Sequence, residues 1–394
     1  MGVFIDSDNR CDNFKSLYKN HYFIDKSKIL HEFNKLLYDR MNCVCITKPR
    51  RFGKSSIADM IIAYYSKKRQ EEFKEIFNTL KISGNKISNL NGLLDTSENS
   101  ENEDVALKEI KKEYENTQGK YHTIFIDFSN NITRYDNVND FLSEIEKKII
   151  FELNIIYKSY NIDKYGNLYK NNLNDYLEYL YSETRERFIF VIDEWDCMFV
   201  DNLFTIEERK YYLSFLKCLL KDKSYVAFTY MTGVLPIAKG TSGTSLNNFR
   251  EFTMLKDKIF YKYFGITEDE IRYLCEKNGQ LRYEDMENWY NGYKSYNGEK
   301  IFNTWTVMNA LNNNSIDNYW NESSSKNEIK NNINFNFNGV KEEFLKLVVG
   351  EKIKIQLNGY GAENTQKIVS KIENENEEKN TSIQKGITIN TKKK

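Results

Sequence analysis

The segment CVCITKPRRFGKS, Cys43–Ser55, decides the fold. Its first residues form a short apolar run, Cys43–Ile46, which predicts a buried strand. A basic turn follows and ends in the tripeptide Gly-Lys-Ser. Apolar residues then recur at helical spacing over residues 57–64, so a helix is expected directly after the turn. A strand, a turn and a helix in this order are typical of sites where backbone N–H groups and a helix N-terminus bind phosphate.

Two side chains of this turn suit nucleotide chemistry. Lys54 would reach the β- and γ-phosphates of ATP, and the hydroxyl of Ser55 would complete the coordination shell of Mg²⁺. One position departs from the usual pattern, because Lys48 stands where a glycine is expected and Pro49 removes one N–H. The alternative interpretation is an ordinary basic turn with solvated side chains. Nucleotide binding, with Mg²⁺ at the phosphates, is the favoured interpretation.

A second informative stretch is Phe188–Ile192, a fully apolar run that predicts a central parallel strand. Asp193 and Glu194 follow it, at the edge where open α/β sheets place their ligands. Asp193 is therefore a candidate Mg²⁺ ligand. Glu194 is placed to polarise the water that attacks the γ-phosphate. The alternative is that these carboxylates only end a strand with polar residues.

A further strand is expected at Tyr225–Thr232. Thr229, Thr232 or both could reach the γ-phosphate from its end, although each could equally be an ordinary β-branched strand residue. Residues 236–248 carry glycine, serine and threonine and predict a mobile loop.

Composition restricts the functional classes. The chain has 394 residues, with 57 Lys and Arg against 57 Asp and Glu, and this balance argues against a general nucleic-acid or membrane-surface binder. The six cysteines lack zinc spacing and fit a reducing, intracellular compartment. No secretory leader and no membrane-spanning apolar run is visible.

Strands alternating with helices predict an α/β fold. By analogy, the extra strand between the basic turn and the acidic strand favours a P-loop NTPase core of the ASCE/AAA-like type, with three layers and a parallel sheet, followed by a small helical domain. We predict the following division of the chain. It has an N-terminal extension (1–19), an ATPase domain (20–262) with a low-complexity insertion (84–119), a mainly helical subdomain (263–357) and a disordered polar tail (358–394).

Several segments, in order along the chain, resemble one family. They are YFIDKS (22–27), KPRRFGKSS (48–56), FVIDEWD (190–196), TGV (232–234), SLNNF (245–249), FGITEDEI (264–271), WYNGY (289–293) and IFNTW (301–305). Together they resemble the AAA-ATPase-like family, whose members commonly carry a PD-(D/E)XK nuclease-like domain at the C-terminus. The resemblance covers residues 17–355, and the PRRFGKS form of the turn is itself a mark of the family, which tolerates a residue other than glycine at position 48.

The resemblance implies an AAA-type core that binds and hydrolyses ATP. The implied nucleotide-binding residues are Arg50, Arg51, Phe52, Gly53, Lys54, Ser55 and Ser56. Ser55 and Asp193 are then the Mg²⁺ ligands, and Glu194 is the catalytic carboxylate. Thr232 stands where a sensor residue would be and is the second catalytic candidate.

Two features of the sequence depart from the family pattern. Thr304 replaces the proline of an NPW-like motif, and no Asp followed by Glu-x-Lys occurs after residue 340. The nuclease-like domain is therefore expected to be missing, with the chain truncated relative to its relatives. A nucleotide-binding switch or degenerate interaction module with little hydrolysis, and a DNA-associated partner of nucleases, are the alternatives. Besides ATP, a homo-oligomer and an unidentified protein client remain open as partners.

Overall fold

The computed structural model describes eight stretches of the chain and two short strands. The stretches are residues 2–37, 39–84, 100–130, 132–158, 172–200, 204–237, 246–290 and 292–319. The short strands, Ile355–Gln356 (β9) and Thr388–Ile389 (β10), pair with each other in antiparallel fashion. Most of the predicted loop at 236–248, the end of the predicted C-terminal subdomain and most of the predicted tail lie outside the described residues.

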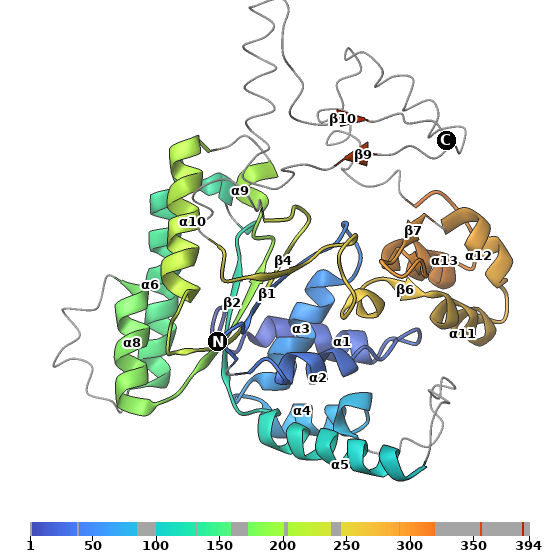
Figure 1. Cartoon of the computed structure of the whole chain (residues 1–394), viewed down its shortest axis with the longest axis horizontal. Coiled ribbons are helices and arrows are strands. Elements are labelled where there is room, and N and C mark those ends of the chain that lie inside the picture. The colour runs from blue at the N-terminus through green and yellow to red at the C-terminus, as the bar shows by residue number, and fades with distance from the viewer. Residues whose placement is uncertain are drawn as a thin grey trace, which may run out of the picture.

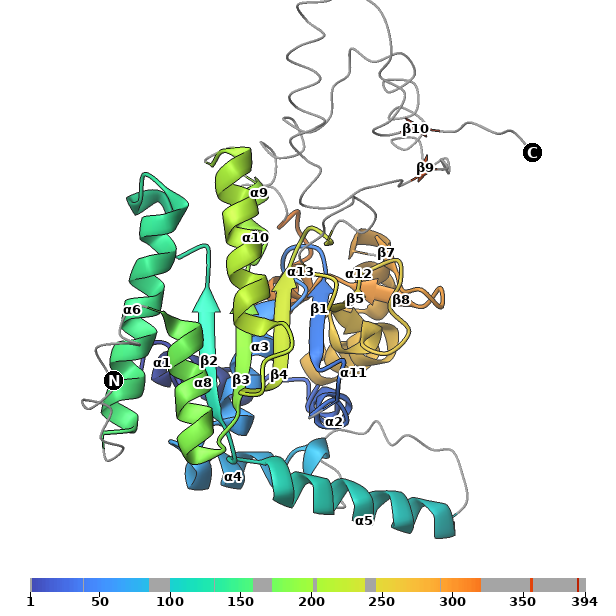
Figure 2. The ribbon, with the colours of Figure 1, turned by 60° about the vertical axis from the view of Figure 1, so that its left-hand side comes forward.

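A parallel sheet of five strands forms the centre of the fold, in the order β2-β3-β4-β1-β5. The strands are Cys43–Thr47 (β1), His122–Asp127 (β2), Phe188–Asp193 (β3), Val226–Gly233 (β4) and Arg250–Phe252 (β5). The first four were predicted, whereas the three-residue β5 was not. Strands β1, β3 and β4 are buried along their whole length, because helices cover both faces of the sheet (Figures 1 and 2). The predicted α/β, P-loop NTPase-like fold is confirmed.

Two helical layers enclose this sheet. One layer contains Val138–Ile156 (α6), Leu173–Thr184 (α8) and Ile206–Leu220 (α10), with the short Cys197–Val200 (α9) above it in Figure 1. The other contains Asp8–Tyr18 (α1), Lys28–Asn34 (α2), Lys54–Tyr65 (α3) and Gln70–Phe77 (α4). Three short 3₁₀ turns lie at Lys81–Ser83, Ile132–Arg134 and Tyr261–Tyr263.

The predicted N-terminal extension differs from the structure. Residues 8–18 form α1, which packs along α3 through the fully buried Cys11 and Phe14. Arg10 of the same helix lies 3.4 Å from Asp59 on α3 and 3.6 Å from Asp127 at the end of β2. With only two apolar side chains facing the core, α1 has too weak a sequence pattern to be predicted. The α1 helix is therefore part of the core.

The predicted insertion at 84–119 also contains ordered structure. Ser100–Thr117 is a helix (α5), and its C-terminal end packs on the core through the buried Tyr114. The hydroxyl of Tyr114 donates to Asn78, and the hydroxyls of Tyr64 and Thr117 are hydrogen bonded. Residues 85–99 of the predicted insertion lie outside the described part of the chain.

The described part of the C-terminal subdomain contains helices and a small antiparallel sheet. Its helices are Glu268–Asn278 (α11), Tyr283–Tyr290 (α12) and Thr304–Asn313 (α13). Its strands are Ile266–Thr267 (β6), Tyr293–Lys294 (β7) and Lys300–Phe302 (β8), which form an antiparallel sheet in the order β6-β8-β7. Strands of two or three residues leave no alternation to read in a sequence. Capping boxes at Thr205 and Thr267 begin α10 and α11.

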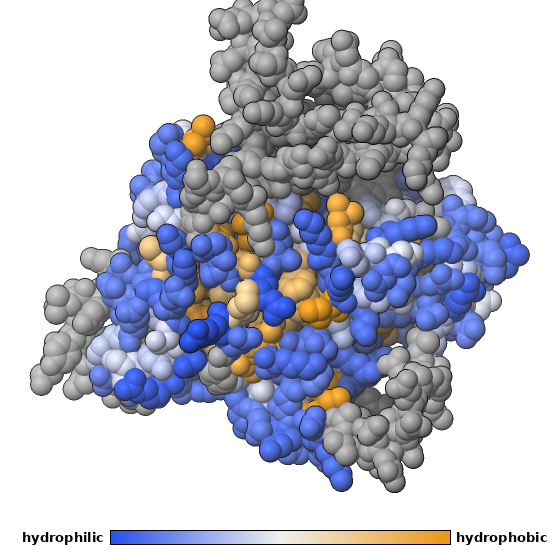
Figure 3. All heavy atoms as spheres, in the orientation of Figure 1, coloured by the Kyte–Doolittle hydropathy of each residue, from blue (hydrophilic) through white to orange (hydrophobic). Residues whose placement is uncertain are grey.

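The outer surface fits this layered architecture. Figure 3 shows a mostly hydrophilic surface over α5, α8 and the C-terminal subdomain. Across the described ranges, the structure contains no helix with both the length and the apolar character needed to cross a bilayer.

Candidate functional site

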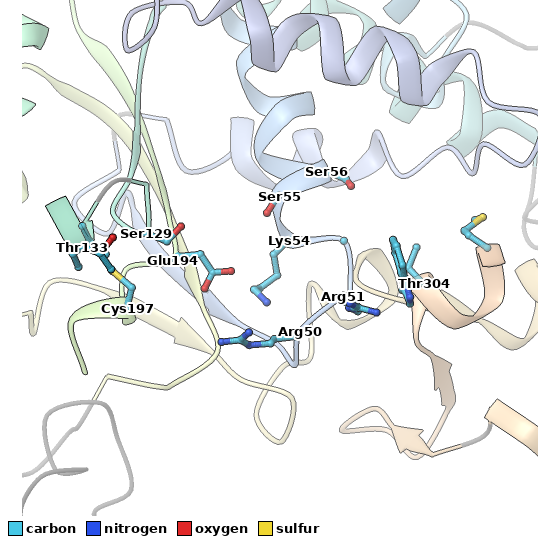
Figure 4. Close-up of a pocket in the computed structure, with 14 residues that line it drawn as sticks. Arg50, Arg51, Lys54, Ser55, Ser56, Ser129, Thr133, Glu194, Cys197 and Thr304 are labelled. Carbon is cyan, nitrogen blue, oxygen red and sulfur yellow. The ribbon is translucent and has the colours of Figure 1, made fainter. Parts of the chain in front are cut away.

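A cavity of about 730 Å³ lies where β3 ends and α3 begins (Figure 4). Its volume is in the usual range for small-molecule sites. Four regions of the chain form its walls: the turn that leads into α3, the segment after β2, the segment after β3, and the first half of α13. The lining residues are Arg50, Arg51, Gly53, Lys54, Ser55, Ser56, Ser129, Ile132, Thr133, Glu194, Cys197, Thr304, Trp305 and Met308.

The GKS turn, residues 48–55, connects β1 to α3 and presents the N-terminus of α3 to the cavity. Gly53 is the N-cap of α3 and has φ +83°, a left-handed conformation that favours glycine. Ser55 and Ser56 lie in the first turn of this 12-residue helix and line the cavity. The first N–H groups of a helix have no partners within it and carry partial positive charge. This wall of the cavity therefore suits an anion.

Lys54 adds a full positive charge to the same wall. Its Nζ donates to the carbonyl oxygens of Lys48 and Pro49, each at 3.2 Å, so the amine spans the turn. Burial lowers the pKa of Lys54, and the nearby carboxylate of Glu194 opposes that shift. Figure 4 shows both side chains directed into the same space. An anion bound here would compete with the two carbonyls for the amine.

Asp193 and Ser55 meet behind this wall. The last residue of β3, Asp193, is buried and accepts a hydrogen bond from the Ser55 hydroxyl. Its Oδ1 also accepts from the backbone N–H of Glu194 at 3.1 Å. Burial raises the pKa of Asp193 to about 6. The structure thus brings together two predicted residues that lie far apart in the sequence.

Glu194 lines the cavity opposite the GKS turn. Its φ is +50°, an uncommon conformation for a residue with a side chain and one that is often found at functional sites. Two backbone hydrogen bonds fix the turn that follows β3. The Trp195 N–H donates to the Thr232 carbonyl, and the Cys197 N–H donates to the Glu194 carbonyl. Burial raises the pKa of Glu194, which strengthens the carboxylate as a base.

A buried carboxylate also supports the end of β4. Asp196 Oδ2 accepts from the N–H groups of Val234 at 3.0 Å and Leu235 at 2.6 Å. Gly233 lies so close that an added Cβ would stand 2.3 Å from Asp196 Oδ1 and 2.7 Å from the Trp195 ring. These contacts fix the carboxyl ends of β3 and β4 relative to each other.

Lys48, the departure from the usual turn pattern, points away from the cavity. Its Nζ lies 2.7 Å from Asp257 Oδ2, and the two side chains are 1% and 0% exposed. Asp257 Oδ1 accepts from the N–H groups of Ile259 and Phe260. The Lys48 N–H donates to the Gly233 carbonyl, which continues the pairing of β1 with β4. Lys48 therefore anchors the start of the turn to the segment that leads into the C-terminal subdomain.

The other turn residues contact the C-terminal subdomain. The buried Phe52 ring packs edge-to-face on Tyr293 with centroids 4.8 Å apart, so its side chain does not enter the cavity. The Phe52 carbonyl accepts from the Gly265 N–H at 2.9 Å. Asn303 Nδ2 donates to the Arg50 carbonyl at 3.1 Å. The predicted nucleotide-binding stretch is thus held partly by a region about 200 residues later in the chain.

Arg51 lies at the boundary between the turn and α13. Its guanidinium stands over the ring of Trp305 at 4.4 Å. Its Nη1 is buried without a hydrogen-bond partner among the described residues. Arg51 also has φ +68°. A buried cationic N–H group without a hydrogen-bond partner destabilises the folded protein unless a bound anion accepts its hydrogen bond.

The structure places the Thr232 hydroxyl differently from the sequence-based expectation. Thr232 is fully buried, and its Oγ1 donates to the Ile46 carbonyl on β1 at 2.8 Å. In the part of the chain that the structure describes, Thr232 does not line the cavity. The role of Thr232 as a sensor of the γ-phosphate stays a prediction.

Sequence reasoning missed several lining residues. Ser129 follows the carboxyl end of β2, and the rule that ligands bind at this edge could have indicated it. Thr304, Trp305 and Met308 come from α13, and nothing local in the sequence shows that α13 starts beside the GKS turn. Cys197 lines the cavity as well, but burial raises its pKa well above the ordinary value, which opposes thiolate chemistry.

The residues present fit Mg²⁺ only together with a ligand. The described ranges contain no group of three or more His, Cys, Asp or Glu side chains arranged to hold a metal ion. The Ser55 hydroxyl and the Asp193 carboxylate are hard oxygen donors in mutual contact. Mg²⁺ commonly takes one or two protein oxygens and completes its shell with phosphates and water.

A parallel sheet, a basic turn between a strand and a helix, and carboxylates at the end of the central strand β3 together define the P-loop NTPase-like class of α/β proteins. Residues 11–241 match the model of the AAA-ATPase-like family, described as Predicted AAA-ATPase. The chain belongs to this family, and the resemblance noted from the sequence segments is confirmed. No curated protein and no solved structure matches the chain significantly.

Proposed function

We propose that the chain binds Mg-ATP in the cavity of Figure 4 and hydrolyses it, coupling the nucleotide state to conformational change. One observation carries the proposal: cationic donors and the N-terminus of α3 face the half-buried carboxylate of Glu194 across one cavity. Lys54 would bind the terminal phosphates, and Ser55 with Asp193 would hold Mg²⁺. The ion would supply positive charge that offsets the charge of the phosphates. Glu194 would take a proton from the attacking water.

The unpaired donor of Arg51 supports an anionic ligand. Leaving a buried donor without a partner costs about 1–3 kcal/mol. A phosphate oxygen would satisfy Arg51 Nη1 and would also free Lys54 from the two carbonyls of its own turn. The family described as Predicted AAA-ATPase agrees with this ligand class.

A second candidate function is a nucleotide-dependent switch with little hydrolysis. The position of Thr232 favours it, because the hydroxyl expected to sense the γ-phosphate is bonded to Ile46 instead. Both functions require ATP binding, and they differ in turnover.

Calorimetry of Mg-ATP binding to the wild type and to Lys54→Ala tests the part that both functions share. We expect binding by the wild type and loss of most affinity in the variant, because the charged donor to the phosphates is removed. Lys221→Ala, which removes the cation that donates to Asn247, is the matched control and should leave binding unchanged. A folded wild type that does not bind Mg-ATP refutes the proposal.

Steady-state phosphate release then separates the two functions. Glu194→Gln should keep ATP binding and lower turnover by about 10²-fold or more, the scale expected for a lost proton-transfer group. Glu207→Gln, at an exposed position on α10, should behave like the wild type. Unchanged turnover in Glu194→Gln would remove this carboxylate from the chemistry. A wild type that binds ATP but releases no phosphate above the rate of a protein-free control would favour the switch.

A further inference from the structure

The cavity has two chemically different ends. Glu194, Ser129 and Thr133 lie on one side of Lys54 in Figure 4, and Thr304 lies on the other. The Thr304 end also contains Trp305 and belongs to α13 of the C-terminal subdomain. The first end therefore carries the carboxylate of Glu194, whereas the α13 end offers aromatic and thioether surface beside the Arg51 guanidinium.

This polarity sets the direction of a bound nucleoside triphosphate. If the chain binds ATP as proposed, the terminal phosphate belongs at the end with Lys54 and Glu194, where the cation and the carboxylate are. The other phosphates then follow the first turn of α3 past Ser56. The base is left at the α13 end of the same cavity.

Trp305 is exposed, as are Trp289 and Tyr296 of the same subdomain, but among these three rings Trp305 is the one that lines the cavity. Phe302 is fully buried, and Tyr283 and Tyr290 are buried as well. Trp305 is 43% exposed although it belongs to the first turn of a packed helix. Burying such a ring against core neighbours would have been favourable, so its exposure at a cavity wall points to a ligand.

The position of this ring is fixed relative to the GKS turn. Arg51 covers one face of Trp305 at 4.4 Å, a cation–π contact that holds the ring beside the turn. Asn303 ties the start of α13 to the same turn, because its Nδ2 donates to the Arg50 carbonyl and its Oδ1 accepts from the Thr306 N–H. Met308, one helical turn further along α13, adds a polarizable surface to the same wall.

We propose that Trp305 and Met308 form a base subsite, in which the aromatic base of a nucleoside triphosphate stacks on the Trp305 ring. This inference rests on the proposed nucleotide site and adds the part of the ligand that reaches the C-terminal subdomain. A bound nucleotide would contact the sheet core and α13 at the same time. Because purines offer a larger stacking face, the subsite favours purine over pyrimidine triphosphates.

The test compares ligands with and without a base. Binding of ATP, UTP and inorganic tripolyphosphate, each with Mg²⁺, is measured by calorimetry on the wild type, Trp305→Ala, Trp305→Phe and Lys54→Ala. We expect Trp305→Ala to weaken ATP binding by about 5- to 150-fold, the range expected for one stacked base. Tripolyphosphate binding should stay within about twofold of the wild type. Trp305→Phe should recover most of the affinity, and the preference for ATP over UTP should shrink in Trp305→Ala.

Trp289→Ala is the matched control, because this tryptophan is 60% exposed on α12 and does not line the cavity in the described part of the chain. This variant should bind ATP and tripolyphosphate with the affinities of the wild type. If Trp305→Ala leaves ATP binding unchanged, or weakens ATP and tripolyphosphate equally, the base subsite is refuted while the phosphate site stands. If Lys54→Ala loses neither ligand, or the wild type binds neither, the proposed function fails and the base subsite fails with it.

Discussion

The ion pair between Lys48 and Asp257 gives a sharp prediction, because it explains the unusual residue in the GKS turn. The pair is almost fully buried, and Asp257 also caps the backbone of Ile259 and Phe260. Lys48→Met removes the cation and leaves Asp257 as an unpaired buried charge. Asp257→Asn removes the anion but keeps an oxygen for the backbone caps, so it isolates the effect of charge.

The magnitude follows from burial. Breaking a buried pair by removing one partner costs about 3–5 kcal/mol, because the remaining charge is uncompensated. Each single variant should therefore lose roughly this much free energy of unfolding. The double variant Lys48→Met/Asp257→Asn contains neither charge and should lose clearly less than the sum. We expect a coupling energy of at least about 2 kcal/mol, within the range seen for contacting residues.

Urea unfolding of the four proteins at pH 7, without nucleotide, measures this cycle. Lys223→Met is the control, because Lys223 pairs with Glu178 at 2.6 Å on the surface and its loss should cost at most about 1 kcal/mol. Single variants whose effects add within about 0.5 kcal/mol would refute the reasoning. Lys48→Gly, which restores the usual glycine, should be destabilised like Lys48→Met and should bind Mg-ATP no better than the wild type.

Three further predictions concern other parts of the site. Burial raises the pKa of the Asp59 carboxyl to about 7, although the charge of Arg10 opposes this shift. The free energy of unfolding that the neutral Asp59 contributes is therefore fully present below about pH 4, and it is lost as the pH rises through about 7. Asp59→Asn should therefore gain stability over the wild type by up to about 4 kcal/mol between pH 4 and pH 8 in urea unfolding, and a constant difference would contradict this. Gly233→Ala should cost about 1–3 kcal/mol in the same assay, because the new methyl group would meet Asp196 and Trp195, and an unchanged midpoint would show that these groups relax freely. Asn303→Asp keeps the α13 cap but loses the donor to the Arg50 carbonyl, so calorimetry should show Mg-ATP affinity reduced by about 5- to 20-fold, and unchanged affinity would rule out a role for this hydrogen bond.

The central sheet was accessible from sequence because its strands are long and uniformly apolar. Phe188–Ile192 could only be a strand buried on both faces, and the carboxylates after it had to emerge at the ligand edge. By contrast, β5 has three residues and follows a polar loop, so no periodicity marks it. The contact of Ser55 with Asp193 followed from the same edge rule, since parallel strands and the turns after them share one side of the sheet.

The supports of the site were not accessible in this way. Lys48 reads as one more basic residue of a turn, and its partner Asp257 lies 209 residues later, with nothing local to connect them. In the sequence, Trp305 stands out only as the last residue of the segment IFNTW. Long-range contacts bring α13 to the cavity: the packing of Phe52 on Tyr293, and the hydrogen bond from Asn303 to the Arg50 carbonyl. Whether a strand-end hydroxyl such as Thr232 faces a cavity or a neighbouring carbonyl depends on geometry that a sequence does not contain.

The place of β5 has a consequence for how the chain can be divided. The family model ends at residue 241, before β5, Asp257, Asn303 and Trp305. A chain cut at that boundary would lose β5 and leave β1, the strand that leads into the GKS turn, as an open sheet edge. The unpaired backbone N–H and C=O groups of such an exposed apolar edge strand pair readily with a strand of another molecule. The part of the chain that matches the family model is therefore shorter than the part that folds by itself, and a fragment of residues 11–241 is expected to aggregate.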